Sequence, residues 1–236
     1  MTANEIKFIK KLHQKKYRKE EGKYFVEGKK LVDEALENCP HLIEFIYTSD
    51  SNFEASSEVN IQSISPKEMS RITALKTPSP FLAVIKMNST EPKKKSKTLF
   101  LENIKDPGNF GTIIRSVDWF GMDAVYYSPE CVDIYNPKVI QATMGSFFRV
   151  PLIEKASSEL RAVGSQIIGA TLQGNDLGEF VVPENFCLVI GSESHGISED
   201  LISQLDQQVK IPGYGKAESL NASVAAGILL FAFSQS

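Results

Sequence analysis

From residue 98 to the C-terminus, short apolar runs alternate with segments of helical periodicity. Strands that alternate with helices form a largely parallel sheet with helices on both faces, which is an α/β fold. Ligands of such sheets bind at the carboxyl ends of the strands. The pattern predicts strands at 98–102, 124–127, 150–153, 166–172, 186–191 and 208–211, and helices at 109–120, 137–144, 157–163, 198–205 and 219–233.

The residues before this alternating region have a different pattern. Residues 1–88 mix short helices and strands, which predicts a small α/β domain of their own. Residues 89–97 are polar, lysine-rich and without periodicity, which is typical of a linker. We therefore expect three parts: a first domain at 1–88, a linker at 89–97 and a larger domain at 98–236.

Composition limits the class of protein. The three cysteines include no Cys-x-x-Cys pair, so neither a disulfide framework nor a thiolate zinc site is indicated, and we expect no metal. The N-terminus is charged and lacks the apolar core of a signal peptide, and the apolar run at 222–233 is too short to cross a bilayer. These features predict a cytoplasmic protein that does not enter a membrane.

The charge of the chain is unevenly distributed. The net charge is −3, but residues 1–30 hold ten Lys and Arg against four Glu, so this stretch carries +6 and the remainder −9. A local basic stretch can supply phosphate contacts, while an acidic body discourages indiscriminate association with nucleic acid. A solvated helix face would give the same pattern, so charge alone leaves both interpretations open.

Three motifs follow predicted strands and carry the chemistry. The first is Asn109–Arg115, the second is Gly191–Gly196, and the third is the long run Ile211–Ile228, in which a glycine loop leads into an alanine-rich helix. Each motif alone is ambiguous, but their order and spacing together are specific. The chain resembles the SpoU family of RNA ribose 2′-O-methyltransferases in all three.

This resemblance implies both an activity and a fold. The activity is methyl transfer from S-adenosylmethionine to a ribose 2′-hydroxyl of RNA. The SPOUT superfamily, which includes SpoU, folds with a trefoil knot in its C-terminal part and commonly forms homodimers, and we expect both here. Residues 18–36 resemble the start of the substrate-binding domain that precedes many SpoU catalytic domains, which makes RNA contact by the basic N-terminus the favoured interpretation.

The resemblance also assigns catalytic candidates. Arg115 is the principal one, because a guanidinium can bind a phosphate bidentately while it orients the neighbouring ribose hydroxyl. A role as general base is harder to reconcile with the very high pKa of arginine, and a structural salt bridge is the remaining alternative. The other candidates are polar side chains of the three motifs: Asn109, Glu193, Ser219 and Asn221. Ser219 could equally be only a helix N-cap.

The cofactor candidates lie where strands end. Small residues let the backbone approach and hydrogen-bond an adenosine group. The resemblance places cofactor contacts at Thr171, Leu172, Gly191, Gly196, Ile211 and Leu220. His195 has no ligand-like spacing to His13 or His41, so we interpret it as a loop histidine and not as a metal ligand.

Some positions depart from the family pattern. Many relatives carry asparagine at Ser192, glycine at Ser194, methionine at Gly213 and arginine at Gln141. The departure at Gln141 concerns an expected secondary contact to RNA or to a second subunit.

Two other classes of function remain open. A non-catalytic RNA-binding or ribosome-assembly protein could retain this fold, although the intact polar motif residues disfavour it. A dinucleotide-dependent enzyme is disfavoured because no Gly-x-Gly-x-x-Gly follows the first strand of the alternating region. Ribosomal RNA is the expected substrate, and transfer RNA is the alternative.

Overall fold

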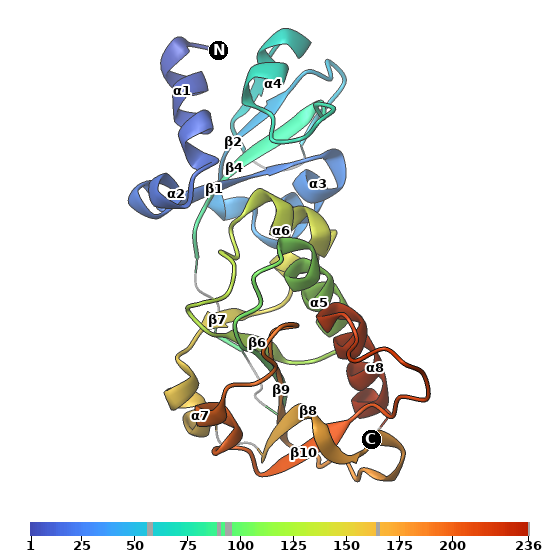
Figure 1. Ribbon diagram of the computed structural model, residues 1–236. Helices are drawn as coiled ribbons and strands as arrows, with labels where there is room; N and C mark the ends of the chain where they lie inside the picture. Colours follow the sequence, from blue (N-terminus) through green and yellow to red (C-terminus); the bar gives the residue numbers. More distant parts are fainter. Residues whose placement is uncertain (56–58, 89–90, 93–95, 164–165, 236) are drawn as a thin grey trace. The chain divides into compact units, whose positions relative to one another are not determined.

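The chain divides into two compact units, and they do not follow a single cut in the sequence (Figure 1). The computed structural model describes residues 1–236 except 56–58, 89–90, 93–95, 164–165 and 236. Unit 1 contains residues 1–88 and 133–149, and unit 2 contains residues 89–132 and 150–236. Residues 89–90 and 93–95 of the expected linker lie outside the described residues.

Unit 1 is built on a mixed four-stranded sheet in the order β1-β4-β2-β3. β4 pairs antiparallel with β1 and β2, while β3 pairs parallel with β2. The strands are β1 (Lys23–Glu27), β2 (Ile43–Thr48), β3 (Ile61–Ser63) and β4 (Phe81–Lys86), and the helices in this part are α1 (Ala3–Leu12), α2 (Lys15–Glu21), α3 (Lys29–Asn38), the short 3-10 helix η1 (Pro40–Leu42) and α4 (Pro66–Ile72).

Helix starts in unit 1 follow local side-chain chemistry. Thr2 caps α1 and Ser65 caps α4, each in a capping box with the glutamate three residues later, Glu5 or Glu68. Ile6, Ile9 and Leu12 are spaced to lie on one face of α1, and all three are buried. They pack in one core cluster with Phe25, Met69 and Leu82, so that α1 covers the sheet beside α4.

The segment 133–149 extends this unit. It contains α6 (Pro137–Thr143) and the 3-10 helix η2 (Ser146–Phe148). Ile140 is 1% exposed within the second core cluster of unit 1, and the Tyr135 and Phe147 rings pack against Tyr24. The Arg18 guanidinium pairs with Asp133, and Arg149 pairs with Glu34.

Unit 2 holds a six-stranded sheet in the order β10-β8-β9-β5-β6-β7, and every recorded pairing is parallel. The strands are β5 (Lys97–Leu101), β6 (Ala124–Tyr127), β7 (Leu152–Glu154), β8 (Gln166–Asp176), β9 (Phe186–Ile190) and β10 (Gln207–Lys210). The helices are α5 (Pro107–Trp119), α7 (Glu199–Ile202), α8 (Ala222–Ser234), and the 3-10 helices η3 (Ser157–Val163) and η4 (Leu177–Glu179).

Helices cover both faces of this sheet, as predicted. Side chains alternate between faces along a strand. On β9, Phe186 contacts Phe233 of α8, with ring centroids 5.0 Å apart. The neighbouring Cys187 faces the other way and packs in a cluster that includes Leu160 of η3 and Leu201 of α7. The predicted α/β class and parallel sheet are therefore confirmed.

Several boundaries differ from the prediction. The expected helix at 157–163 is a 3-10 helix, and the one at 198–205 shortens to Glu199–Ile202. β8 continues to Asp176, beyond the expected end at residue 172. The last helix begins at Ala222 instead of residue 219. Among the described residues, none of the helices combines the length and apolar character that a bilayer crossing requires.

Candidate active site

Three neighbouring strands end at the same edge of the unit 2 sheet. β8 lies between β10 and β9, and all three run parallel. Gly191 follows β9 and Ile211 follows β10, while Thr171 and Leu172 lie within β8, two and three residues beyond Gly169, which pairs with Val189 near the end of β9. These four predicted cofactor positions share one edge, which is the edge where parallel α/β sheets bind their ligands.

The end of β8 is irregular. Its register against β10 jumps from Gly169, opposite Gln208, to Asn175, opposite Val209, so that residues 170–174 bulge out of the ladder. The Thr171 hydroxyl donates to the Gln208 side chain at 2.8 Å, which anchors the bulge. The Leu172 side chain is 70% exposed, so the bulge presents an apolar group at the sheet edge.

The loop after β9 is a tight turn without room for a side chain at its start. Ser192 and Gly196 exchange two backbone hydrogen bonds, of 2.9 and 3.1 Å. A Cβ atom on Gly191 would lie 2.1 Å from the Gly196 carbonyl oxygen, and Gly196 has a φ of +67°. The two glycines are therefore required by the turn itself, and the turn leaves Glu193 exposed at its tip.

Asn109 connects the three motifs. Asp106 caps α5 by accepting from the Asn109 backbone at 2.7 Å, which fixes Asn109 in the first turn. The Asn109 side-chain amide donates to Glu193 of the second motif. Its Oδ1 accepts from Asn221 of the third motif at 3.0 Å, and from Ser223 at 3.3 Å. We call Asn109, Glu193, Asn221 and Ser223 the amide hub.

The long loop 211–221 leads from β10 into α8 (Figure 1). Asn221 caps α8 by accepting from the Ser223 and Val224 backbones. The alternative of an N-cap role for Ser219 is therefore wrong, because the capping residue is Asn221, two residues later. Ser219 lies exposed in the loop, Leu220 is 45% exposed, and Ile211 is half-buried.

Arg115 lies on α5, one and a half turns beyond Asn109, and its side chain is exposed. Within the described part of the chain it has no recorded hydrogen bond or ion pair, which disfavours the salt-bridge alternative. The hub thus joins Asn109, Glu193 and Asn221, whereas Arg115 and Ser219 stay outside its hydrogen bonds.

Sequence reasoning missed two members of this arrangement. Ser223 was not a candidate, although a serine two residues after an Asn N-cap is a recognisable first-turn signal. Asp106 was also not a candidate, yet its side chain caps α5 and fixes the position of Asn109. His195 Nδ1 lies 2.8 Å from the Ser194 hydroxyl, within the loop. No group of three metal-ligating side chains occurs in the described residues.

One of the family departures, Gln141, and the glutamate that it contacts lie in ordinary structural settings. Gln141 donates to the Glu27 carbonyl oxygen at 2.5 Å, so it connects α6 to β1 within unit 1. The Glu27 carboxylate accepts from Thr73, Ala74 and Ser79, and so organises the loop before β4 instead of forming a salt bridge. Glu34, also in unit 1, forms a salt bridge with Arg149.

Two family models match this chain, one over its C-terminal region and one over its N-terminal region. The model for the SpoU rRNA Methylase family matches residues 96–231, which include every residue of the hub and the sheet edge. The chain belongs to the SpoU rRNA methylase family. The model for an MRM3-like substrate binding domain matches residues 3–83.

Individual SpoU-family relatives extend over nearly the whole chain. The 23S rRNA (guanosine(2553)-2'-O)-methyltransferase RlmP of Bacillus subtilis is 34% identical over 233 residues, which cover 96% of this chain and 94% of the relative. The crystal structure of an AdoMet-bound rRNA methyltransferase from Sinorhizobium meliloti is 26% identical, with a TM-score of 0.89, and the match covers 100% of this chain and 95% of that one. The SpoU methyltransferase AviRb of Streptomyces viridochromogenes, at 21% identity and a TM-score of 0.85, supports the fold over 100% of this chain and 98% of that chain.

Proposed function

We propose that this protein transfers a methyl group from S-adenosylmethionine to a ribose 2′-hydroxyl of ribosomal RNA. The observation that carries the proposal is the amide hub, which joins all three SpoU motifs at the carboxyl edge of a parallel sheet. The full-length similarity to the Bacillus subtilis rRNA 2'-O-methyltransferase supports RNA as the acceptor and favours ribosomal over transfer RNA.

The sheet edge fits the cofactor. S-adenosylmethionine supplies an activated methyl group on a sulfonium centre, and its adenosine part needs apolar surface and backbone hydrogen-bonding groups. Leu172 and Leu220 offer exposed apolar side chains, and nothing lies within 4 Å of the position that a Cβ atom on Gly196 would take. We assign the adenosine contacts to these residues together with Thr171 and Ile211.

Arg115 is the residue we assign to the RNA acceptor. Its guanidinium is exposed and presents a planar fork of donors, which suits bidentate contact with the phosphate next to the target ribose. Holding that phosphate orients the 2′-hydroxyl and lowers the entropy cost of reaction. Arginine stays protonated at neutral pH, so positioning and charge compensation suit it better than proton abstraction.

The remaining polar residues position the loops. Asn109 uses both ends of its amide, so the loop with Glu193 and the start of α8 are held at fixed distances from α5. We assign Glu193 and Asn221 to this arrangement, with their free hydrogen-bonding capacity directed to substrate. Ser219, exposed in the loop before α8, is assigned a hydrogen bond to RNA.

Methyl transfer to RNA from cells that lack the protein tests the proposal. Purified protein with labelled S-adenosylmethionine is expected to methylate ribosomal RNA from the deletion strain and not RNA from the parent strain, in which the target is already modified. Mapping of 2′-O-methyl groups in both RNA pools then identifies the nucleotide. Methylation of transfer RNA alone would overturn the ribosomal assignment, and no transfer to either RNA would overturn the activity.

We further propose a homodimer that uses the outer face of α8. Val224, Ile228 and Phe231 lie four and three residues apart on one helix face and are 50%, 38% and 57% exposed. Trp119, at the end of the adjacent α5, is 84% exposed. Exposed apolar patches of this kind mark interaction surfaces. Analytical ultracentrifugation at micromolar concentration tests this proposal, and a strictly monomeric protein would contradict it.

The trefoil knot and the cytoplasmic location complete the proposal. Both are supported by membership of the SpoU family and by the bacterial relative that modifies ribosomal RNA. Location is tested by cell fractionation, in which the protein is expected to follow the ribosomes.

A further inference from the structure

A basic groove in unit 1 lies between the first helices and α4. It has a volume of about 450 Å³ and is lined by Ala3, Ile6, Lys7, Lys10, Lys11, Gln14, Tyr17 and Arg71. Four of these side chains are cations, and no acidic side chain lines the groove. Three of the cations come from α1 and the fourth, Arg71, from α4, more than fifty residues later.

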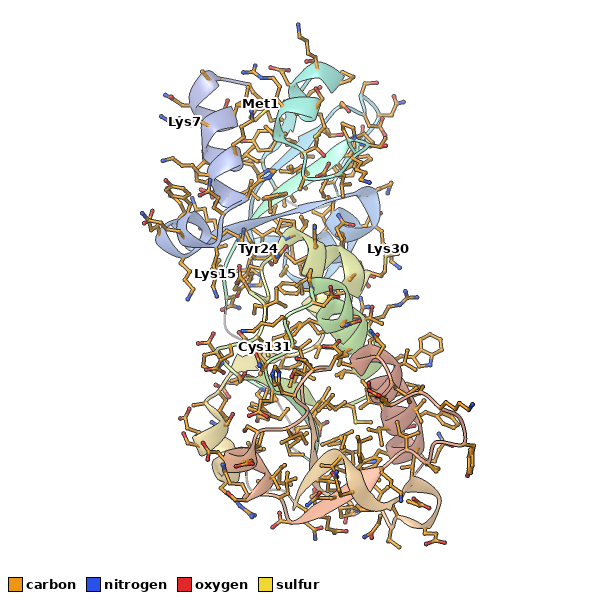
Figure 2. All side chains as sticks on the ribbon, in the orientation of Figure 1. Met1, Lys7, Lys15, Tyr24, Lys30 and Cys131 are labelled. Atoms are coloured by element: carbon orange, nitrogen blue, oxygen red, sulfur yellow. The ribbon has the colours of Figure 1, made fainter. Side chains whose placement is uncertain are left out.

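The structure separates the cations of residues 1–30 into two groups. Lys16, Arg18, Lys23 and Lys29 form ion pairs with Glu20, Asp133, Glu44 and Asp33. The other six, which are Lys7, Lys10, Lys11, Lys15, Lys19 and Lys30, have no recorded ion pair in the described part of the chain, and neither does Arg71. Of these unpaired cations, Lys7, Lys10, Lys11 and Arg71 line the groove. Lys7 is one of the cations of α1 (Figure 2). The solvated-face interpretation predicts no such convergence of unpaired cations from two separate elements.

Nearby carboxylates do not neutralise the groove. Glu5 of α1 accepts from Thr2 and Glu68 of α4 accepts from Ser65, both in capping boxes at the starts of their helices. Hydrogen bonds with Thr2 lower the pKa of Glu5, and the hydrogen bond from the N-terminal ammonium, followed by those from Ser65, lowers the pKa of Glu68 to about 2, so both carboxyls stay ionised where they are. Their charges are therefore directed to the helix starts, while the lysines occupy the following turns.

Tyr17 organises one of the cations. The Lys11 ammonium lies 5.4 Å from the centre of the Tyr17 ring, within the range of a cation–π contact. Lys11 is half-buried and Tyr17 lines the same groove, so the contact limits the freedom of that charge. A charge that is already held loses less entropy when it binds a phosphate.

We propose that this groove binds the sugar-phosphate backbone of RNA, through Lys7, Lys10, Lys11 and Arg71, at a distance in sequence from the methyl-transfer site. The inference rests on the proposed function and names the place where the RNA substrate is bound. Lysines and one arginine without base-specific partners provide affinity without sequence preference. The groove therefore contributes affinity for RNA, and methyl transfer takes place at the sheet edge of unit 2.

The test compares two variants of the full chain that remove the same charge. The groove variant carries Lys7→Gln, Lys10→Gln, Lys11→Gln and Arg71→Gln. The matched control carries Lys67→Gln, Lys76→Gln, Lys86→Gln and Lys138→Gln, which are all exposed in unit 1 and lie outside the groove. The probe is a fluorescent 20-nucleotide oligouridine, and its affinity is measured by anisotropy from about 0.05 to 0.2 M salt.

The groove variant is expected to bind the probe at least roughly tenfold more weakly, with a salt slope smaller by about three, because each lost phosphate contact removes about 0.7. The control is expected to change far less. Equal losses of probe affinity in both variants would mean that the effect comes from the overall charge of unit 1 and not from the groove. Unchanged affinity in the groove variant would also overturn the proposal. A smaller variant, Lys10→Gln with Arg71→Gln, should reduce the salt slope by about 1.4, which is half the reduction expected for the groove variant, and it guards against misfolding of the larger one.

Methyl transfer to ribosomal RNA separates this inference from the proposed function. If the parent protein methylates RNA but the groove variant keeps parental affinity, only the groove is wrong. If the parent transfers no methyl group while the probe still binds in the groove, the proposed function is wrong and the RNA site stands.

Discussion

The two units use polar side chains in opposite ways. In unit 1, some charged groups are buried and paired: Arg18 is 3% exposed and contacts Asp133, and the 2%-exposed Glu27 accepts three hydrogen bonds. In unit 2, the polar groups of the three motifs are mostly exposed, and the hub consists of two amides, one hydroxyl and one carboxylate. The buried charges of unit 1 therefore contribute to stability, whereas the motif groups of unit 2, like the cations of the groove, are available to a ligand.

The difference follows from the kind of sheet. In unit 1, the distant segment 133–149 completes the core on one face of the mixed sheet, and ion pairs at both ends hold this segment in place. The parallel sheet of unit 2 is apolar on both faces, and on β9 every residue is buried. The polar side chains of the three motifs consequently lie in the loops and helix starts that follow the strands, where most of them are accessible.

The largest expected effect concerns a buried ion pair of unit 1. Arg18→Ala removes the cation that pairs with the Asp133 carboxylate, which is only 13% exposed. It also removes the guanidinium hydrogen bond of 2.8 Å to the Leu12 carbonyl oxygen. Loss of one partner of a buried pair typically costs about 3–5 kcal/mol. Urea unfolding should show this loss. Lys16→Ala, which breaks the 74% and 54% exposed pair with Glu20, is the control and should cost less than about 1 kcal/mol.

The next effect is on catalysis by unit 2. Arg115→Lys and Arg115→Ala should each reduce methyl transfer at least roughly a hundredfold, because an ammonium has no planar fork to orient the ribose. Affinity for S-adenosylmethionine, measured by calorimetry, should change little. Arg161→Lys, at a surface pair with Asp206, is the control. Near-parental turnover of Arg115→Lys with saturating RNA would rule out the orienting role.

A smaller loss is expected from the hub. Asn109→Asp replaces the amide donor with a carboxylate that faces Glu193, so the loop after β9 is repelled from α5. We expect methyl transfer to fall about tenfold with little change in the melting temperature, since a positioned group is displaced but no core is opened. Ser223→Ala removes a single 3.3 Å contact to the same residue and should have a weaker effect. If both variants behave like the parent, the hub does not position the site.

The last prediction concerns the three buried cysteines, which should not react with an alkylating reagent in the folded protein. Burial raises the pKa of Cys187 to about 12 and that of Cys39 to about 11, and it also raises the pKa of Cys131. Because only the thiolate reacts, iodoacetamide at pH 8 should leave all three cysteines unmodified in the folded protein and modify them in urea. Mass spectrometry of the intact protein measures both states. Rapid labelling of Cys187 without urea would mean that the unit 2 sheet opens readily.

Local pattern predicted most of unit 2, because each of its elements depends on neighbours in sequence. The strand at 124–127 and the 3-10 segment at 157–163 have the predicted limits, and the three motifs were placed at strand ends. The start of α8 was misplaced because Ser219 and Asn221 are both good capping residues, and only the fold selects Asn221. The bulge in β8 and the membership of residues 133–149 in unit 1 depend on partners far away in sequence, such as Arg18 and Asp133, which no periodicity reveals.

The position of residues 133–149 has a consequence for the order in which the protein is made. The N-terminal part leaves the ribosome first, yet Ile140, Tyr135 and Phe147 belong to its core and are synthesised much later. Unit 1 therefore cannot complete its folding until residue 149 has emerged, by which time β5, α5 and β6 of unit 2 are already outside. A fragment that ends at residue 88 would expose the apolar surface that this segment covers, so the two matched family regions are not two independent folding units.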